Sequence, residues 1–375
     1  MHNIPTLLNN WVEQRTQGNQ AYLTLASLAI LSSIILFIPF WITGDFDTVF
    51  RQWDGPNYAY VAKTLYDIPV DHPLTPYGTT QAYFACHLPI YPMTIRLFSF
   101  MGYNNAMIFT TLLYTVLATL TFYQLLKETK AVESPVWSAF ISLFIPARYL
   151  LTHSIGATES TFLFFTFASL LSYHRGHYVL AFFFGGLMSI TRIVGILIGG
   201  AYFIMLIKDG KWKQLPWLLI GAVPLLLTFT FHYYQFGDFF AYFSWNNSLI
   251  HSIPADIFKY YATTGDAQSA EFYLVMYGLY GCGVALLWRK QLFFWYAAIM
   301  YTFCLFIFHQ DVSRYLIPIA PFALVIAYDQ ILTRKEIRIV FIPMLVLVYI
   351  YVYNMMHHNL IVEWVFENLQ KVLAQ

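Results

Sequence analysis

The chain has 375 residues, of which 59% are hydrophobic and only 10% are charged, whereas soluble domains carry about 25% charged residues. The net charge is +1, and the mean hydropathy is +0.57. This composition excludes an ordinary soluble globular protein, and uncharged runs of about 20 residues along the whole length predict an all-α polytopic membrane protein.

The apolar runs predict about eleven transmembrane helices in one integral membrane domain that covers residues 1–375. The first run has no charge and no small-residue cleavage pattern after it, so we expect it to be retained as a span. The predicted spans are 21–42, 105–126, 135–151, 158–173, 178–190, 193–207, 215–234, 271–288, 292–308, 315–332 and 337–356.

The short runs 178–190 and 193–207 form either a hairpin or one continuous helix. The positive-inside rule distinguishes the two. With a cytoplasmic N-terminus and a hairpin, twelve of the 20 basic residues but only six acidic ones lie on the cytoplasmic side. A single helix would instead place Lys208, Lys211 and Lys213 outside. We therefore predict the hairpin.

Two large segments, 43–104 and 235–270, are then expected on the extracytoplasmic or lumenal side. The first is predicted to hold two interfacial helices, near 55–67 and 89–101, because neither stretch is long enough to span. Residues 357–375 have the pattern of an amphipathic helix on the outer surface. The membrane is expected to be the plasma membrane in a bacterium or the endoplasmic reticulum in a eukaryote.

Asp54 is the most informative residue of the first outer segment. The stretch Trp53-Asp54-Gly55-Pro56 follows the first span and suits the start of a helix, where exposed N–H groups favour a negative charge. A carboxylate in this position is expected to stay ionised and to accept a proton. Trp53 is interpreted either as a platform for a sugar or as an interface anchor.

Three arginines, Arg148, Arg192 and Arg314, lie near the outer ends of predicted spans and are not needed to explain the topology. One interpretation is that they reach lipid headgroups or pair with Glu159 and Asp311. Their shared position on the side of the outer carboxylate favours an anion site instead. In that site Arg192 and Arg314 hold a phosphate, and Arg148 is a weaker third contact.

A carboxylate and several arginines at an outer membrane face suit sugar transfer from a lipid phosphate. The carboxylate takes the proton of the attacking hydroxyl, and the arginines stabilise the departing phosphate. The sequence contains no P-loop and no GxGxxG pattern, which fits a reaction that needs no nucleotide. The expected partners are a polyprenyl-phosphate sugar, a glycan or glycolipid acceptor and membrane lipids, with no nucleic acid and no cofactor.

Several short motifs occur in an order that resembles a known family. They are Trp53-Asp54 with Tyr58 and Val61-Ala62, Tyr83-Phe84, Leu88-Pro89-Ile90-Tyr91-Pro92, Ala157-Thr158-Glu159-Ser160, Thr191-Arg192-Ile193-Val194-Gly195, Phe236-Gly237-Asp238 and Ser313-Arg314-Tyr315-Leu316-Ile317-Pro318. Over about residues 20–330 this order resembles the PIG-V-like mannosyltransferases, which belong to the GT-C class and use polyprenyl-phosphate sugars. The chain departs from the family pattern at Phe84-Ala85-Cys86-His87-Leu88-Pro89, where relatives read Phe-Phe-Pro, so His87 is a candidate particular to this chain.

The resemblance implies a GT-C-like inverting transferase with Asp54 as the catalytic base, and mannose is the sugar we expect. The substrate-binding candidates are Trp53, Tyr58, His87, Glu159, Asp238 and Tyr315. A GT-C enzyme for glucose or arabinose stays open. A lipid transporter or flippase without chemistry is the other alternative, and it predicts inverted repeats and sites near the middle of the bilayer.

Some of these residues also have simpler interpretations. Asp45-Phe46-Asp47 is a DxD pair at the end of the first span, and we interpret it as a solvated turn rather than a metal site, so no bound metal is expected. Glu159 is interpreted as a helix cap or as a partner of Arg192 or Arg148. Asp238, which follows a glycine, suits a turn.

Overall fold

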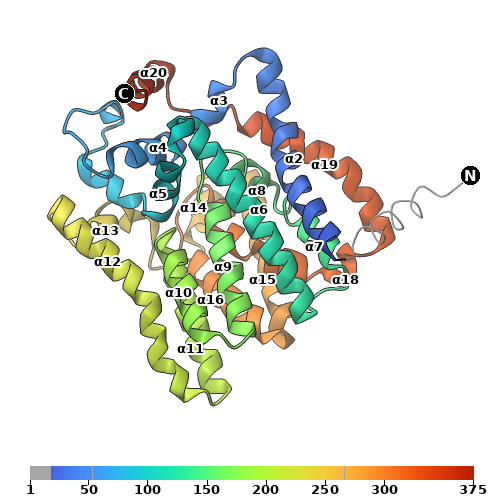
Figure 1. Ribbon diagram of the computed structural model, residues 1–375. Helices are drawn as coiled ribbons and strands as arrows, with labels where there is room; N and C mark the ends of the chain where they lie inside the picture. Colours follow the sequence, from blue (N-terminus) through green and yellow to red (C-terminus); the bar gives the residue numbers. More distant parts are fainter. Residues whose placement is uncertain (1–17, 53, 266) are drawn as a thin grey trace, which may run out of the picture.

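The computed structural model describes residues 18–52, 54–265 and 267–375 (Figure 1). This part of the chain is helical and has the architecture of an α-helical membrane protein. Five helices in it are long and apolar enough to cross a membrane. They are α2 (Asn19–Thr43), α6 (Tyr103–Thr129), the helix Trp212–Phe236 that contains α12 (Leu219–Phe236), the helix Gln268–Arg289 that overlaps α15 (Ala267–Leu286), and α19 (Lys335–Met355).

Other apolar helices are too short to meet this criterion. They include α10 (Tyr178–Ser189), the helix Ile193–Lys208 that ends in α11 (Ile198–Lys208), and α16 (Gln291–Cys304). The figure of about eleven spans therefore stays a prediction. The outer faces of the long helices are apolar, since Leu226 and Leu227 of α12 and Val346 and Leu347 of α19 are more than half exposed. Such a surface fits contact with lipid.

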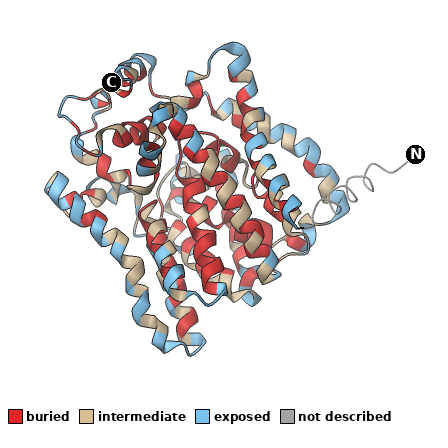
Figure 2. Ribbon diagram, viewed as in Figure 1, coloured by how far each residue is buried: buried red, intermediate tan, exposed pale blue. Residues whose placement is uncertain are grey.

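Helix α9 (Glu159–His174) forms the centre of the bundle. It packs along α6 and along α10, and the ring of Phe167 stacks on that of Phe122 of α6 with their centres 4.6 Å apart. Figure 2 shows α9 buried along nearly all of its length. A helix with apolar side chains all round is stable only in such a position. The packing of α9 fixes the place of its first residue, Glu159.

Two predicted spans are not continuous helices. Residues 135–151 form α7 (Pro135–Ile141) and α8 (Ala147–Thr152), separated by a break that ends at Pro146. Proline lacks an N–H group and disfavours helical backbone in the residue before it, so the first helix cannot run through this point. Residues 315–332 are likewise divided, into the end of α17 (Val312–Tyr315), a 3-10 turn Ile317–Ile319, a π-helical turn Pro321–Ile326 and α18 (Asp329–Leu332).

The region 178–207 consists of two separate helices, so the continuous-helix alternative is wrong. Helix α10 ends at Ser189, and Arg192 has an extended backbone before the chain becomes helical again at Ile193. Gly195 lies directly against the end of α10, because a Cβ atom there would be 2.5 Å from the carbonyl carbon of Met188. This close approach folds the chain back at Arg192.

The two segments predicted to lie outside the membrane contain short helices near the predicted positions. Those of the first segment are α3 (Asp47–Phe50), α4 (Asp54–Thr64) and α5 (Ile90–Leu97), and those of the second are α13 (Ala241–Asn246) and α14 (Asp256–Thr264). The predicted C-terminal helix is α20 (Glu363–Leu373). Its buried side chains include Val365, Phe366 and Leu369, and the helix packs on α4, as Figure 1 shows. The apolar face of α20 therefore covers protein.

Candidate functional site

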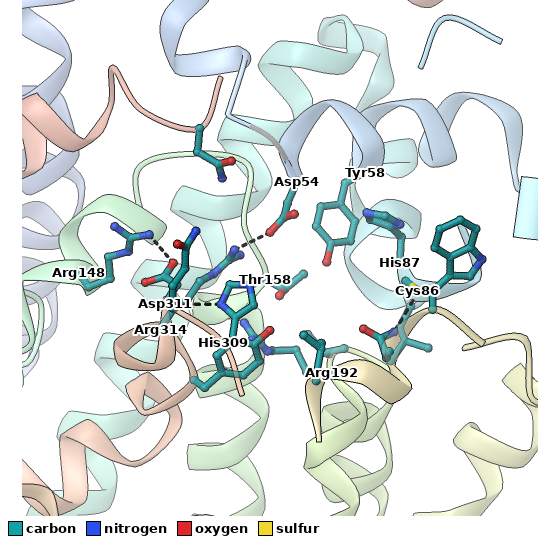
Figure 3. A pocket seen from close by; sticks show the side chains of 18 of the residues that line it. Asp54, Tyr58, Cys86, His87, Arg148, Thr158, Arg192, His309, Asp311 and Arg314 are labelled. Carbon is teal, nitrogen blue, oxygen red and sulfur yellow. Dashed lines mark hydrogen bonds and ion pairs between the residues drawn. The ribbon is translucent and has the colours of Figure 1, made fainter. Parts of the chain in front are cut away.

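A cavity of about 1060 Å³ lies where α4, α13, the start of α17 and the C-terminal segment meet. Its wall includes Asp54, His87, Arg148, Arg192 and Arg314. Figure 3 shows these side chains around one hollow, although they come from five distant parts of the sequence. The structure thus brings together the predicted base and all three predicted phosphate-binding arginines.

Asp54 is the first residue of α4, as the Asp-Gly-Pro pattern predicts. The residues before it are tied to the C-terminal segment. Arg51 donates from Nε and Nη2 to the carbonyl of Ile361 at 3.1 and 2.9 Å, and Gln52 Nε2 donates to the carbonyl of Met356 at 2.7 Å. These bonds hold the start of α4 against the end of the chain, so Asp54 projects into the cavity from a fixed backbone.

The Asp54 carboxylate forms an ion pair with Arg314, with Oδ2 and Nη1 2.6 Å apart. Burial by itself raises the pKa of Asp54, but the positive charge and the hydrogen bond of Arg314 outweigh it, and the net pKa lies below the ordinary value. Asp54 is therefore ionised at neutral pH, which is the state that a general base requires.

Glu159 joins two of the arginines. Its Oε1 atom is 2.5 Å from Nε of Arg314 and 2.5 Å from Nη1 of Arg192, and its side chain is fully buried. As the first residue of α9, it also lies where a negative charge is favoured by the helix dipole. Of the interpretations considered for Glu159, the pairing with Arg192 is the one that the contacts show. Three ion pairs thus form one continuous chain, from Asp54 through Arg314 and Glu159 to Arg192.

Arg148 pairs with Asp311 instead of Glu159. Asp311 also accepts a hydrogen bond from Ser313 Oγ at 3.2 Å, and its N–H donates to Nδ1 of His309 at 3.0 Å. The alternative interpretation, in which these arginines pair with Glu159 and Asp311, thus describes the contacts that they make. A phosphate would have to bind to donors that remain on Arg192 and Arg314, or displace one of these pairs.

Aromatic rings form the wall on the other side of Asp54. The ring of His87 lies 4.8 Å from that of Tyr58 and 5.2 Å from that of Tyr83, centre to centre. Burial lowers the pKa of His87 to about 4, although Asp54 partly opposes the shift, so the imidazole is neutral at pH 7. Burial also raises the pKa of Tyr58, so its hydroxyl stays protonated. Both side chains are neutral hydrogen-bonding groups beside an ionised carboxylate.

Tyr315 contacts Arg192 in the cavity wall. The Arg192 guanidinium lies over the Tyr315 ring, 5.7 Å from the ring centre. The close approach of Gly195 to Met188 explains the position of Arg192, because it turns the chain into the cavity just after α10. The Thr-Arg-x-x-Gly motif therefore has a structural basis: the glycine lets the arginine reach the site.

Two predicted substrate-binding residues, Glu159 and Asp238, are not among the residues that line the cavity, and a third, Trp53, is not described. Trp53 is outside the described part of the chain, so its role stays a prediction. Asp238 is exposed and is not among the cavity residues: it accepts bonds from the Phe240 N–H at 2.8 Å and from Ser244 Oγ at 3.2 Å. This is the turn that the simpler interpretation expects.

Asp45 of the DxD pair accepts a hydrogen bond from Thr48 Oγ1 at 2.8 Å, at the start of α3. Among the described residues no group of three or more His, Cys, Asp and Glu side chains is arranged to hold a metal ion. The expectation of metal-free chemistry stays a prediction.

Sequence reasoning missed the parts of the wall that come from α13 and from the C-terminal segment. Asn246 of α13 donates to Cys86 Sγ at 3.0 Å, and Gln310, His358 and Asn359 line the opposite part of the cavity. No sequence spacing identifies these residues as part of a binding site. In the structure Asn359 has a φ of 59°, which is in the left-handed region that asparagine tolerates.

An apolar groove of about 610 Å³ lies beside the cavity. It is lined by α12 residues such as Val223 and Leu227, together with Met93 of α5. Two chain segments lie between the hollows, since Leu88 and Thr191 line the cavity while Pro89 and Ile190 line the groove. A polar site and an apolar channel therefore lie next to each other.

Comparisons of the chain with protein-family models, with curated proteins and with solved structures found no match.

Proposed function

We propose that this chain is a membrane glycosyltransferase that moves a hexose, with mannose as the expected sugar, from a polyprenyl-phosphate donor to a hydroxyl of a lipid-linked or glycan acceptor. The observation that carries the proposal is the ionised Asp54 facing one cavity with Arg192 and Arg314, next to an apolar groove. The resemblance to the PIG-V-like mannosyltransferases supports the same reaction.

The reaction follows from the groups in the cavity. Asp54 accepts the proton of the acceptor hydroxyl, and the oxygen forms a bond to the anomeric carbon of the sugar. The bond from that carbon to the phosphate oxygen breaks, and the phosphate leaves with the electron pair and one more negative charge. Arg192 and Arg314 stabilise that charge. Attack opposite to the leaving group inverts the anomeric centre.

The apolar groove supports a lipid-linked donor. A polyprenyl chain needs a long apolar contact surface, and pockets for such ligands are lined by aliphatic and aromatic side chains. The groove has this lining, and its residue Ile190 is followed along the chain by Thr191 and Arg192 of the cavity wall. A lipid in the groove would present its phosphate to that arginine.

The remaining features of the proposal concern the membrane. The cytoplasmic N-terminus, about eleven spans and a site on the extracytoplasmic or lumenal face all rest on the distribution of basic residues. A site at that face suits a donor whose sugar is presented on the same side.

The test is a transfer assay with the purified protein in liposomes. Polyprenyl-phosphate mannose, glucose and arabinose, each with a radiolabelled sugar, are offered with glycolipid acceptors. We expect transfer of label to acceptor from one of the three donors. Movement of labelled donor between the leaflets without any product would support a flippase and contradict the proposal.

A further inference from the structure

The cavity has two ends, and Asp54 lies between them. In Figure 3 Tyr58, Cys86 and His87 lie on one side of the carboxylate, and Arg148 and Asp311 lie on the other. At the first end Leu88 lines the cavity, and the next residue, Pro89, lines the apolar groove. At the second end Asp311 donates its N–H to His309, and His358 and Asn359 of the C-terminal segment line a smaller hollow together with Arg148 and Asp54.

We propose that this second end binds the acceptor, and that the acceptor presents a neutral, hydroxyl-rich sugar there. The inference rests on the proposed function, because an inverting transfer needs the nucleophile and the leaving group on opposite sides of the anomeric carbon. With the lipid in the groove and its phosphate at Arg192, the nucleophile must approach from the end formed by residues 309–311 and 358–359.

The charged groups at this end are already paired. Arg148 and Asp311 form an ion pair, and their side chains are only 14% and 22% exposed. A charged acceptor would have to break this pair at a cost in desolvation and lost attraction. A neutral acceptor leaves the pair in place, which favours a sugar without carboxylate or phosphate groups at this position.

Neutral hydrogen-bonding groups face the cavity here. Nδ1 of His309 accepts the N–H of Asp311, so the neutral ring carries its proton on Nε2 and acts as a donor there. Burial lowers the pKa of His309, with Asp311 opposing the shift, so the neutral form prevails at pH 7. The amides of Gln310 and Asn359, which also line the cavity, each offer donors and an acceptor. This combination suits hydroxyl groups, which both donate and accept.

Two tyrosine rings add an apolar surface. The rings of Tyr261 and Tyr273 stack with centres 5.2 Å apart and line the same cavity. The Tyr273 hydroxyl donates to the carbonyl of Gln310 at 2.6 Å, which places this pair at the second end. Aromatic faces beside amide groups are suited to the alternating apolar and polar surface of a sugar ring.

The second end also reaches Asp54 directly. A small hollow of about 30 Å³ between Asp54, Arg148 and Asn359 extends the cavity behind the carboxylate. This volume is large enough to hold a water molecule or a hydroxyl group. A hydroxyl that enters from this end therefore has access to the proton acceptor.

The experiment is photoaffinity labelling in nanodiscs with octyl α-mannoside that carries a diazirine on a short linker at O6 of the sugar. Gln310→Ala combined with Asn359→Gly removes both amides, and glycine keeps the left-handed backbone of position 359. The matched control is Asn354→Ala, because the exposed Asn354 amide bonds only the Ile350 carbonyl of its own helix and does not line the cavity.

We expect labelled peptides from 309–311 and 356–361. Unlabelled octyl mannoside should compete for labelling better than the anionic octyl glucuronide. Labelling should fall about fivefold or more in the double variant, the size expected for one or two lost hydrogen bonds, and stay unchanged in Asn354→Ala. In the transfer assay the double variant should raise the acceptor KM and leave the donor KM unchanged.

The inference is overturned if labelling is confined to residues 86–88 or 242–249, or if no specific labelling occurs. It is also overturned if the double variant is labelled as strongly as the parent protein, or if the glucuronide competes as well as the mannoside. Labelling does not require turnover. Failure of transfer from every donor would therefore remove the proposed function while the labelling pattern still decides whether a neutral sugar binds at this end.

Discussion

Replacement of Glu159 by glutamine tests the central ion-pair chain of the site. Glu159→Gln keeps the shape of the side chain but leaves Arg192 and Arg314 without the carboxylate that they share. Removing one member of a buried ion pair destabilises a protein by about 3–5 kcal/mol. The Glu159 side chain is fully buried, whereas those of the two arginines retain 18% and 22% exposure. We therefore expect the lower part of that range, about 3 kcal/mol.

Glu128→Gln is the matched control, because it also removes a carboxylate bonded to an arginine. Its partner Arg175 is 44% exposed and Glu128 is 26% exposed, so the loss should be about 1 kcal/mol or less. The measurement is unfolding of each purified variant in mixed micelles with increasing sodium dodecyl sulfate, followed by tryptophan fluorescence. Equal and small losses for Glu159→Gln and Glu128→Gln would refute the view that Glu159 holds the two arginines in a desolvated site.

Three further predictions concern the donor site. Arg192→Lys and Arg314→Lys should each raise the donor KM and reduce turnover by about tenfold or more, because lysine lacks the two-pronged contact; unchanged donor titrations would move the phosphate site elsewhere. Gly195→Ala should lower folded yield or weaken donor binding, because its Cβ would meet the end of α10. Gly199→Ala should behave as the parent protein in both measurements, because in the described structure its added carbon would have no atom from outside its own stretch of helix within 4 Å. Transfer should persist in excess chelator, and loss of activity that manganese or magnesium restores, together with an inactive Asp45→Ala, would establish the DxD pair as a metal site.

Short sequence patterns predict the structure around a residue where that structure depends on its neighbours in the chain. Asp54 starts a helix because aspartate, glycine and proline suit a helix N-terminus. The reversal at Arg192 was predicted from the distribution of basic residues, and the structure shows the glycine that permits it. The pairing of Glu159 with Arg192 follows from the need of a buried charge for a partner.

Signals of this kind fail where the environment comes from distant parts of the chain. The C-terminal segment contacts Arg51 and Gln52 across about 300 residues of sequence, and no periodic pattern records such a contact. The same holds for Asn246 and Gln310, which are ordinary polar residues until the fold places them in the cavity. The break within 135–151 differs, because a local residue, Pro146, indicates it. The prediction of one span there considered only the apolar composition of the segment.

The most direct test of the proposed function is the transfer rate of Asp54→Asn measured beside that of Asp45→Asn, with both purified proteins shown to be folded. Asparagine keeps the shape of Asp54 but cannot accept the proton, so the rate should fall by about 10²–10⁴-fold. Asp45→Asn should transfer sugar at nearly the parental rate, because the Asp45 carboxylate bonds only the Thr48 hydroxyl in the described structure. Transfer by Asp54→Asn at the parental rate would contradict the account.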